Sequence, residues 1–268
     1  MLHLNKVFCY TYDGTFEGLL TSIFEIYERR SWPGEINKSG LVQTSLFSQN
    51  ITVITNEEKA DRVWHGLLKH ISVAARAKLY KVFLSELPES EMLLYRYMQL
   101  AFASKVSIED NFAADCVQQI AEIDKQIFRE KHRMEAFVRF QKTTDDVYYA
   151  AIEPDFNVLP LLQDHFEKRY ADQRWLIYDI RRQYGLYYDL HEVKSIVLEN
   201  RQTNKSGSLP PDILAQHEYL YQQLWQTYFH HVNIPERKNP KLHLRHMPQR
   251  YWKYLTEKKP DITISSSF

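Results

Sequence analysis

The sequence predicts an α+β protein, and three observations indicate this class. Residues 1–128 space their hydrophobic side chains mostly as helices do, residues 129–200 show short strand patterns around one helix, and residues 201–268 combine a linker, a helix and a basic tail. These are the three predicted parts of the chain, a helical lobe, a sheet lobe and a C-terminal segment packed on the core, and together they could form one composite domain. With 44% hydrophobic residues and only 7 Gly among 268, the chain can bury a substantial core.

The N-terminal lobe is predicted to be mostly helical, with one short pair of strands. Lys6 to Tyr12 is rich in β-formers and ends at an Asp-Gly turn, and a helix is predicted to begin at Thr15. The second strand is predicted at Ile51 to Thr55. Asn56 then caps a helix, and the chain continues mostly as helix to Ile127.

The central lobe is predicted to be an antiparallel sheet that carries a helix on one face, in the order strand–strand–helix–strand–strand. Hydrophobic and β-branched residues in short runs mark the strands, and Pro160 fits the first turn of the helix. The predicted strands are 136–140, 147–152, 175–179 and 184–188, with a possible fifth at 194–198, and the helix is 158–170.

A polar linker at Arg201 to Pro211 and a helix at Asp212 to His230 precede a basic, helical tail. Between Glu236 and Lys259 the tail has eight Lys or Arg against two Glu, with aromatic residues interleaved. Cations attract phosphates, and flat rings offer stacking surfaces to unpaired bases. The residues predicted to bind nucleic acid are Arg139, Lys241, Arg245, Arg250, Tyr251, Trp252 and Lys253.

The basic tail has an alternative structural explanation. Its aromatic side chains would dock the tail onto the core, and its cations would pair with acidic residues elsewhere, because the whole chain balances 34 basic against 34 acidic side chains. Composition does not decide between docking and phosphate binding.

Glu153, Asp155 and Asp179 are the candidate catalytic residues. Each is predicted at or just after the end of a strand, where carboxylates could hold Mg²⁺ or transfer protons. A turn before a helix also favours Asp and Pro for local reasons, so a structural role is the alternative. Mg²⁺ is expected only if the protein is an enzyme, and no other cofactor is predicted.

His132, Arg133, Glu135 and Arg139 form a further cluster, with His165 nearby, but a pair such as His132 and Glu135 shares a face only in a helix and is alone a weak metal signal. His243 and His246 have the same spacing and lack a cysteine partner, so no zinc site is predicted. Cys9 and Cys116 stand far apart and predict two buried thiols in a reducing compartment. No phosphate-binding glycine loop and no nucleophile elbow is present. No secretion signal and no apolar run of about 20 residues is found, so a cytoplasmic protein without membrane contact is expected.

Six blocks of the sequence carry a family resemblance, and they are YDGTFEGLLTSIFEIYERR (12–30), TNEEKADRVWHGL (55–67), HRMEAFVRFQ (132–141), YYAAIEPDFNVLPLL (148–162), DQRWLIYDIRRQYGLYYD (172–189) and NPKLHLRHMPQRYWKYLTE (239–257). They resemble one bacterial family, which is assigned to DNA repair or DNA metabolism and built on a domain of unknown function. The resemblance implies a partner, a radical S-adenosylmethionine protein of DNA repair encoded nearby, and a similar domain is fused to uracil-DNA-glycosylase-like modules. It supplies no catalytic residues.

We therefore expect a DNA-repair or DNA-metabolism protein that binds nucleic acid and works with the radical S-adenosylmethionine partner. The sheet would present tyrosines to a base, and only one of each adjacent pair (Tyr148 or Tyr149, Tyr187 or Tyr188) can face it. Two alternatives stay open. One is an enzyme that acts on damaged nucleic acid through the three carboxylates. The other is an adaptor that binds the partner enzyme through Trp225 and Trp252.

Overall fold

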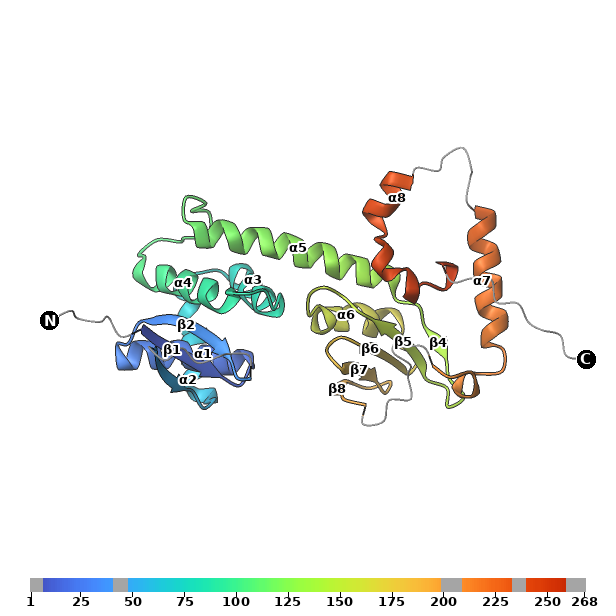
Figure 1. Ribbon diagram of the computed structural model, residues 1–268, viewed down its shortest axis with the longest axis horizontal. Helices are drawn as coiled ribbons and strands as arrows, with labels where there is room; N and C mark the ends of the chain where they lie inside the picture. The colour runs from blue at the N-terminus through green and yellow to red at the C-terminus, as the bar shows by residue number, and fades with distance from the viewer. Residues whose placement is uncertain (1–6, 41–47, 199–208, 233–239, 259–268) are drawn as a thin grey trace, which may run out of the picture. The chain divides into compact units, whose positions relative to one another are not determined.

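The computed structural model describes residues 7–40, 48–198, 209–232 and 240–258, and the chain divides into two compact units, Met1–Ile127 and Phe128–Phe268 (Figure 1). Helices and strands occur in both units, which confirms the α+β class. The division lies next to the boundary predicted at residue 128. Residues 129–200 and the described part of 201–268 belong to the same unit.

The first unit contains a three-stranded parallel sheet in the order β2-β1-β3. The prediction of two strands was therefore wrong, because the sheet has a third. The additional strand, β2, lies in a segment for which no strand was predicted. Proline is tolerated as the first residue of an edge strand, and Pro33 takes that place in β2. The elements are β1 (Val7–Tyr12), α1 (Phe16–Arg29), β2 (Pro33–Lys38), β3 (Ser48–Thr52), α2 (Glu57–Leu67), α3 (Val73–Leu84), α4 (Ser90–Ala103) and the first part of α5 (Asp115–Phe137).

Local sequence sets the helix starts of this unit. The Thr15 side chain accepts a hydrogen bond from the Gly18 amide (2.9 Å), and Asn56 does the same for the Lys59 amide (2.9 Å). Cys9 is buried in β1, whereas Cys116 in α5 is half-buried, and both are free thiols.

The second unit is built on a five-stranded mixed sheet in the order β4-β5-β6-β7-β8. The prediction of an antiparallel sheet was wrong for its central pair, since β5 and β6 run parallel and α6 crosses between them. The segment 136–140 was also predicted wrongly as a strand, because α5 continues to Phe137. The strands and the helix between them are β4 (Gln141–Lys142), β5 (Tyr148–Ile152), α6 (Leu159–Arg169), β6 (Trp175–Asp179), β7 (Tyr184–Tyr188) and β8 (Val193–Ile196).

The C-terminal part of this unit is helical, as predicted. A short 3₁₀ turn, η1 (Pro211–Ile213), precedes α7 (Glu218–Val232), and the tail consists of α8 (Pro240–His246), η3 (Gln249–Tyr254) and η4 (Thr256–Lys258). Most of the predicted linker at 201–211 lies outside the described residues. The tail meets the sheet at β5 through η3, and η4 packs against α7 (Figure 1).

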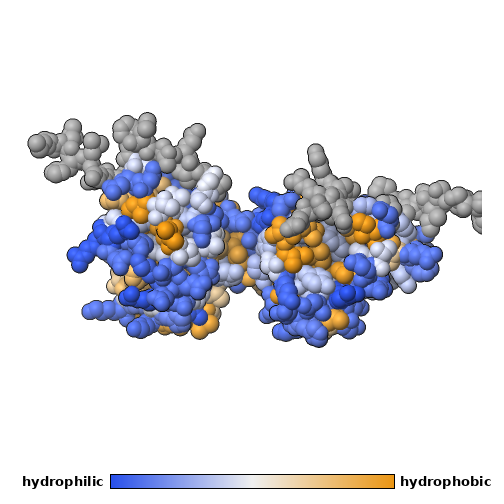
Figure 2. Space-filling model, turned by 90° about the horizontal axis from the view of Figure 1, so that it is seen from below, coloured by the Kyte–Doolittle hydropathy of each residue, from blue (hydrophilic) through white to orange (hydrophobic). Residues whose placement is uncertain are grey.

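The core of the second unit lies between α6 and the sheet. Trp175 of β6 is fully buried, its ring stacks on that of Tyr188 (centroids 5.5 Å apart), and it also touches Phe166 of α6. In both units some hydrophobic side chains reach the surface among hydrophilic ones (Figure 2). In the second unit several of these belong to α7.

Candidate nucleic-acid interface

The structure brings two predicted cations of the tail onto two of the predicted catalytic carboxylates. The Lys253 ammonium pairs with Glu153, and the Arg250 guanidinium lies 2.6 Å from an Asp155 carboxylate oxygen. Tyr254 donates a further hydrogen bond to Glu153 (2.6 Å). Because these pairs are half-exposed, each adds little stability. They do cancel the local charge, so a phosphate would have to displace a carboxylate at either cation.

Asp179, the third carboxylate, is fully buried at the end of β6. It accepts hydrogen bonds from the Arg181 amide (2.9 Å) and the Arg182 amide (3.1 Å), and it pairs with the Arg182 guanidinium (2.9 Å). Burial raises the pKa of Asp179, although these donors oppose the rise. Its contacts hold the turn between β6 and β7, and a catalytic role stays a prediction.

Two predicted stacking residues of the tail are held by the protein itself. Tyr251 is buried, donates to Glu130, and lies beneath the Arg250 guanidinium (4.5 Å to the ring centroid). Trp252 is half-buried, and its indole N–H donates to the Met247 carbonyl oxygen (3.0 Å). Both contacts are those that the docking alternative requires.

Arg139 is engaged in the same way. Its guanidinium forms two hydrogen bonds with Glu257 (2.7 and 3.2 Å) and lies over the Trp225 ring. Glu257 also accepts from the Trp225 indole N–H (2.9 Å). Burial alone would raise the pKa of Glu257, but the donors Arg139 and Trp225 outweigh burial and lower it. This cluster ties the tail to α7 and to the end of α5.

Lys241 and Arg245 differ from the other predicted cations. Both are exposed on α8, and neither forms an ion pair with a residue in the described part of the chain. They remain available to phosphate.

The ion pairs predict how tail docking depends on pH. The pKa values of Glu153 and Glu257 are both lowered, the first by Lys253 and Tyr254, so each carboxylate adds stability above its unfolded pKa of about 4.3 and loses it as pH falls through the folded pKa. The difference in unfolding free energy between wild type and Glu257→Gln should therefore shrink as urea unfolding is repeated from neutral pH to below pH ~4. A difference that stays constant over this range would contradict the assignment.

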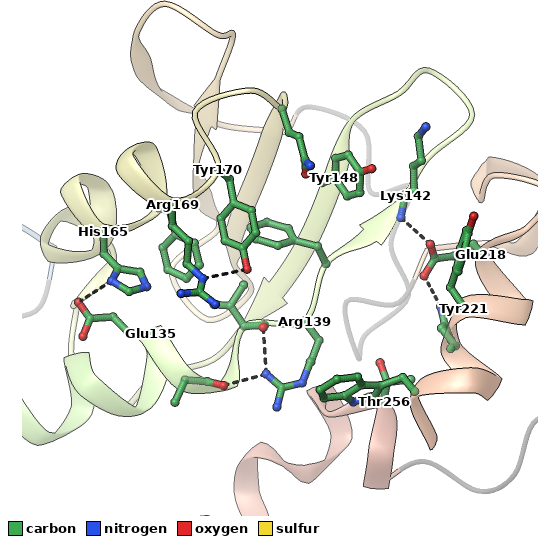
Figure 3. A pocket seen from close by; sticks show the side chains of 17 residues that line it. Glu135, Arg139, Lys142, Tyr148, His165, Arg169, Tyr170, Glu218, Tyr221 and Thr256 are labelled. Carbon is green, nitrogen blue, oxygen red and sulfur yellow. Dashed lines mark hydrogen bonds and ion pairs between the residues drawn. The ribbon is translucent and has the colours of Figure 1, made fainter. Parts of the chain in front are cut away.

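Beside this cluster lies a cavity of about 780 Å³ (Figure 3). His165 and Arg169 reach it from α6, Glu135 lies beside them on α5, and Glu218 and Tyr221 come from α7 on the opposite side. Six of the lining residues are Phe, Tyr or Trp, and they are Phe140, Tyr148, Phe166, Tyr170, Tyr221 and Trp225.

The cavity carries charge as well as rings. Arg169 is exposed, lies 5.7 Å from the Tyr170 ring centroid and forms no ion pair with a described residue. Lys142 pairs with the exposed Asp146 (2.7 Å), while its backbone amide donates to the buried Glu218 (2.9 Å). Glu218 is thus used by the protein, and Arg169 is a cation that a ligand can reach.

A family model described as a domain of unknown function, DUF4130, matches residues 88–257. The chain belongs to the DUF4130 family. No curated protein and no solved structure matches it. The predicted membership of a family built on a domain of unknown function is confirmed, over the second unit and the end of the first. The blocks at 12–30 and 55–67 lie outside the match.

Glu135, Arg139 and His165 of the predicted histidine cluster line the cavity of the DUF4130 protein. In the sequence, this cluster was only a weak indication of metal binding. Glu135 lies 3.7 Å from His165 and 3.9 Å from His132, and it also pairs with Lys131. Within the described residues, no group of three or more His, Cys, Asp or Glu is placed to hold a metal ion. In the same part of the chain, no helix has the length and hydrophobicity to cross a membrane.

Several cavity residues of the DUF4130 protein were missed in the sequence. Lys142 belongs to β4, the adjacent Arg169 and Tyr170 lie at the end of α6, and Tyr221 belongs to α7, so nothing in the sequence spacing joins these three places. Tyr148 was named, and strand alternation turns it to the cavity while Tyr149 is buried. A usable signal was present on α7, where Tyr221 and Trp225 share a helical face that a soluble helix would usually bury.

Proposed function

We propose that the DUF4130 protein binds nucleic acid through its second unit and holds one unpaired base in the aromatic cavity. The observation that carries the proposal is the wall of six aromatic rings around a cavity of about 780 Å³. Pockets for small ligands usually have about 300–1,000 Å³, so one nucleotide fits this space.

The rings supply the attraction. A base stacked on an aromatic side chain gains about 1–3 kcal/mol, whichever base it is, because every base has a flat face. Tyr170 lies parallel to Phe166 (interplanar angle 10°, centroids 6.0 Å apart) and at right angles to Phe140, so its ring is held in a fixed orientation. A ring that is already ordered loses little entropy when a base stacks on it.

The cations would supply phosphate contact. Arg169 lines the cavity without a carboxylate partner in the described residues, and Lys142 is held only by an exposed one. Lys241 and Arg245 on α8 are further exposed cations. The proposed interface therefore leaves out Arg250, Lys253 and Arg139, because these three side chains already pair with carboxylates.

The role in DNA repair and the radical S-adenosylmethionine partner rest on the family resemblance, and both stay predictions. A Mg²⁺-dependent enzyme is not proposed, because the carboxylates of Glu153, Asp155 and Asp179 each contact a cationic side chain of the same unit. Trp252 is less suited to bind a partner protein as an adaptor would, because its ring is half-buried against the tail.

Arg169→Gln tests the proposal directly. Removing one phosphate contact should weaken binding of a labelled single-stranded oligonucleotide on the order of tenfold. It should also reduce the slope of log K against log salt by about 0.7. Fluorescence anisotropy over a range of NaCl concentrations measures both.

Lys168→Gln is the matched control, since Lys168 is the neighbouring exposed cation on α6 and does not line the cavity. It should leave affinity and slope nearly unchanged. Equal effects of the two variants would mean that α6 contributes only diffuse charge, and the cavity would lose its role.

A further inference from the structure

We propose that α7 extends the cavity into a stacking ladder for single-stranded nucleic acid. The ladder consists of Tyr221, Trp225 and Tyr228, and it would receive the bases next to the one held in the cavity. This proposal rests on the nucleic-acid binding proposed above and specifies its substrate: a strand of several unpaired nucleotides.

The three ladder residues lie on one face of the helix. They stand at positions i, i+4 and i+7 of α7, which bring side chains within a narrow arc. Their exposed fractions are 61%, 40% and 58%, so none is used to fill the core. The Trp225 and Tyr228 rings are neighbours, with centroids 5.7 Å apart and an interplanar angle of 33°.

The ladder is continuous with the cavity. Tyr221 and Trp225 line the cavity, whereas Tyr228 lies one turn beyond it. Trp225 is fixed in place by its hydrogen bond to Glu257 and by the Arg139 guanidinium 5.6 Å from its ring centroid. A strand with one base in the cavity would therefore meet further rings along α7.

Charge on α7 also suits a polyanion. Glu218 is the single acidic residue in the sequence of α7, and it is buried with its carboxylate oxygens accepting from the Lys142 amide and the Gln222 side chain. The exposed face of α7 therefore has no carboxylate of its own that would repel phosphates. Leu220 and Leu224 flank the ladder and add apolar surface for sugars.

The spacing of the rings favours a single strand over a duplex. The centroids of the Trp225 and Tyr228 rings lie 5.7 Å apart, and the four residues of helix from Tyr221 to Trp225 rise about 6 Å. Both distances exceed the 3.4 Å step between stacked bases in a duplex. An extended strand with separated bases can match such spacing, but a stacked duplex cannot.

Tyr228→Ala separates the ladder from the cavity, because Tyr228 does not line the cavity. Binding of the full-length protein is measured with thymidine monophosphate and with labelled oligothymidylates of up to about eight nucleotides. In wild type, affinity should rise with length over the first few nucleotides. Tyr228→Ala should weaken the longer oligomers about 5- to 100-fold and leave the mononucleotide unchanged.

Two other variants complete the experiment. Tyr170→Leu, in the cavity, should weaken the mononucleotide and all oligomers alike, whereas Phe112→Ala, which removes an equally exposed ring (56%) in the first unit, should affect none. A blunt-ended duplex without unpaired nucleotides should bind more weakly than the oligomers.

The outcomes distinguish the two proposals. If the mononucleotide binds but affinity depends neither on oligonucleotide length nor on Tyr228→Ala, the ladder is overturned. Its exposed rings would then be explained by contact with a protein partner. If only the oligomers bind and Tyr170→Leu has no effect, the ladder stands and the cavity proposal fails. Binding of the blunt-ended duplex as tight as that of the oligomers would also overturn the ladder.

Discussion

Glu130→Ala is expected to lower the free energy of unfolding by about 3–5 kcal/mol, the usual cost of removing one partner from a buried ionic cluster. The Glu130 side chain is 2% exposed on α5. It accepts hydrogen bonds from the Asp155 amide (2.8 Å) and the buried Tyr251 hydroxyl, and the Arg250 guanidinium lies 3.4 Å away. Alanine would leave the Asp155 amide and the buried Tyr251 hydroxyl without this acceptor, whereas the half-exposed Arg250 would keep its pairing with Asp155.

Urea unfolding at neutral pH measures the loss, and Glu122→Ala is the matched control. Glu122 is an exposed carboxylate on the same helix, and its removal should change stability by no more than about 0.5 kcal/mol. Glu130→Gln, which keeps the shape and one acceptor, should lose less than alanine does. A loss under about 1 kcal/mol for Glu130→Ala would mean that Glu130 does not anchor the tail.

Glu257→Ala is expected to have a similar effect, about 3–5 kcal/mol, for a related reason. The Glu257 side chain is 1% exposed, and its removal leaves the Arg139 guanidinium, itself only 23% exposed, without a counter-charge. Trp225 would lose its hydrogen bond at the same time. Since Trp225 belongs to the proposed ladder, oligonucleotide affinity should fall together with stability.

A double-mutant cycle separates the pair from its surroundings. Arg139→Met with Glu257→Leu removes both charges and retains side-chain volume, so it should recover much of the stability that Glu257→Leu alone loses. If the double variant is as unstable as the sum of the two single variants, the two side chains do not act as a pair, and another contact of Glu257 must explain its burial.

Elements with a strong local pattern could be predicted from the sequence. The strands Trp175–Asp179 and Tyr184–Tyr188 have the bounds that were predicted, since short runs of apolar and aromatic residues favour a strand locally. The start of α1 at Thr15 follows from a cap that involves residues three positions apart. Segment 136–140 failed because its β-formers end a long helix, where tertiary packing overrides local preference.

The direction in which neighbouring strands pair was harder to predict from the sequence than the strands themselves. The helix α6 between β5 and β6 could have indicated a parallel pair, because a helix between two adjacent strands is the usual parallel crossover. The strand β2 offered little, as its first residues, Pro33 and Gly34, are poor strand formers.

The sequence by itself determined the α+β class, the family and the presence of cations, carboxylates and rings in particular segments. Tertiary structure alone decided which of them meet. Arg139 finds Glu257 118 positions away, and Lys253 finds Glu153 100 positions away. Periodicity reports contacts within a helix or strand, but the neighbour of a charged side chain across the fold depends on how the elements pack. The same packing placed Arg169, Tyr170 and Tyr221 around one cavity.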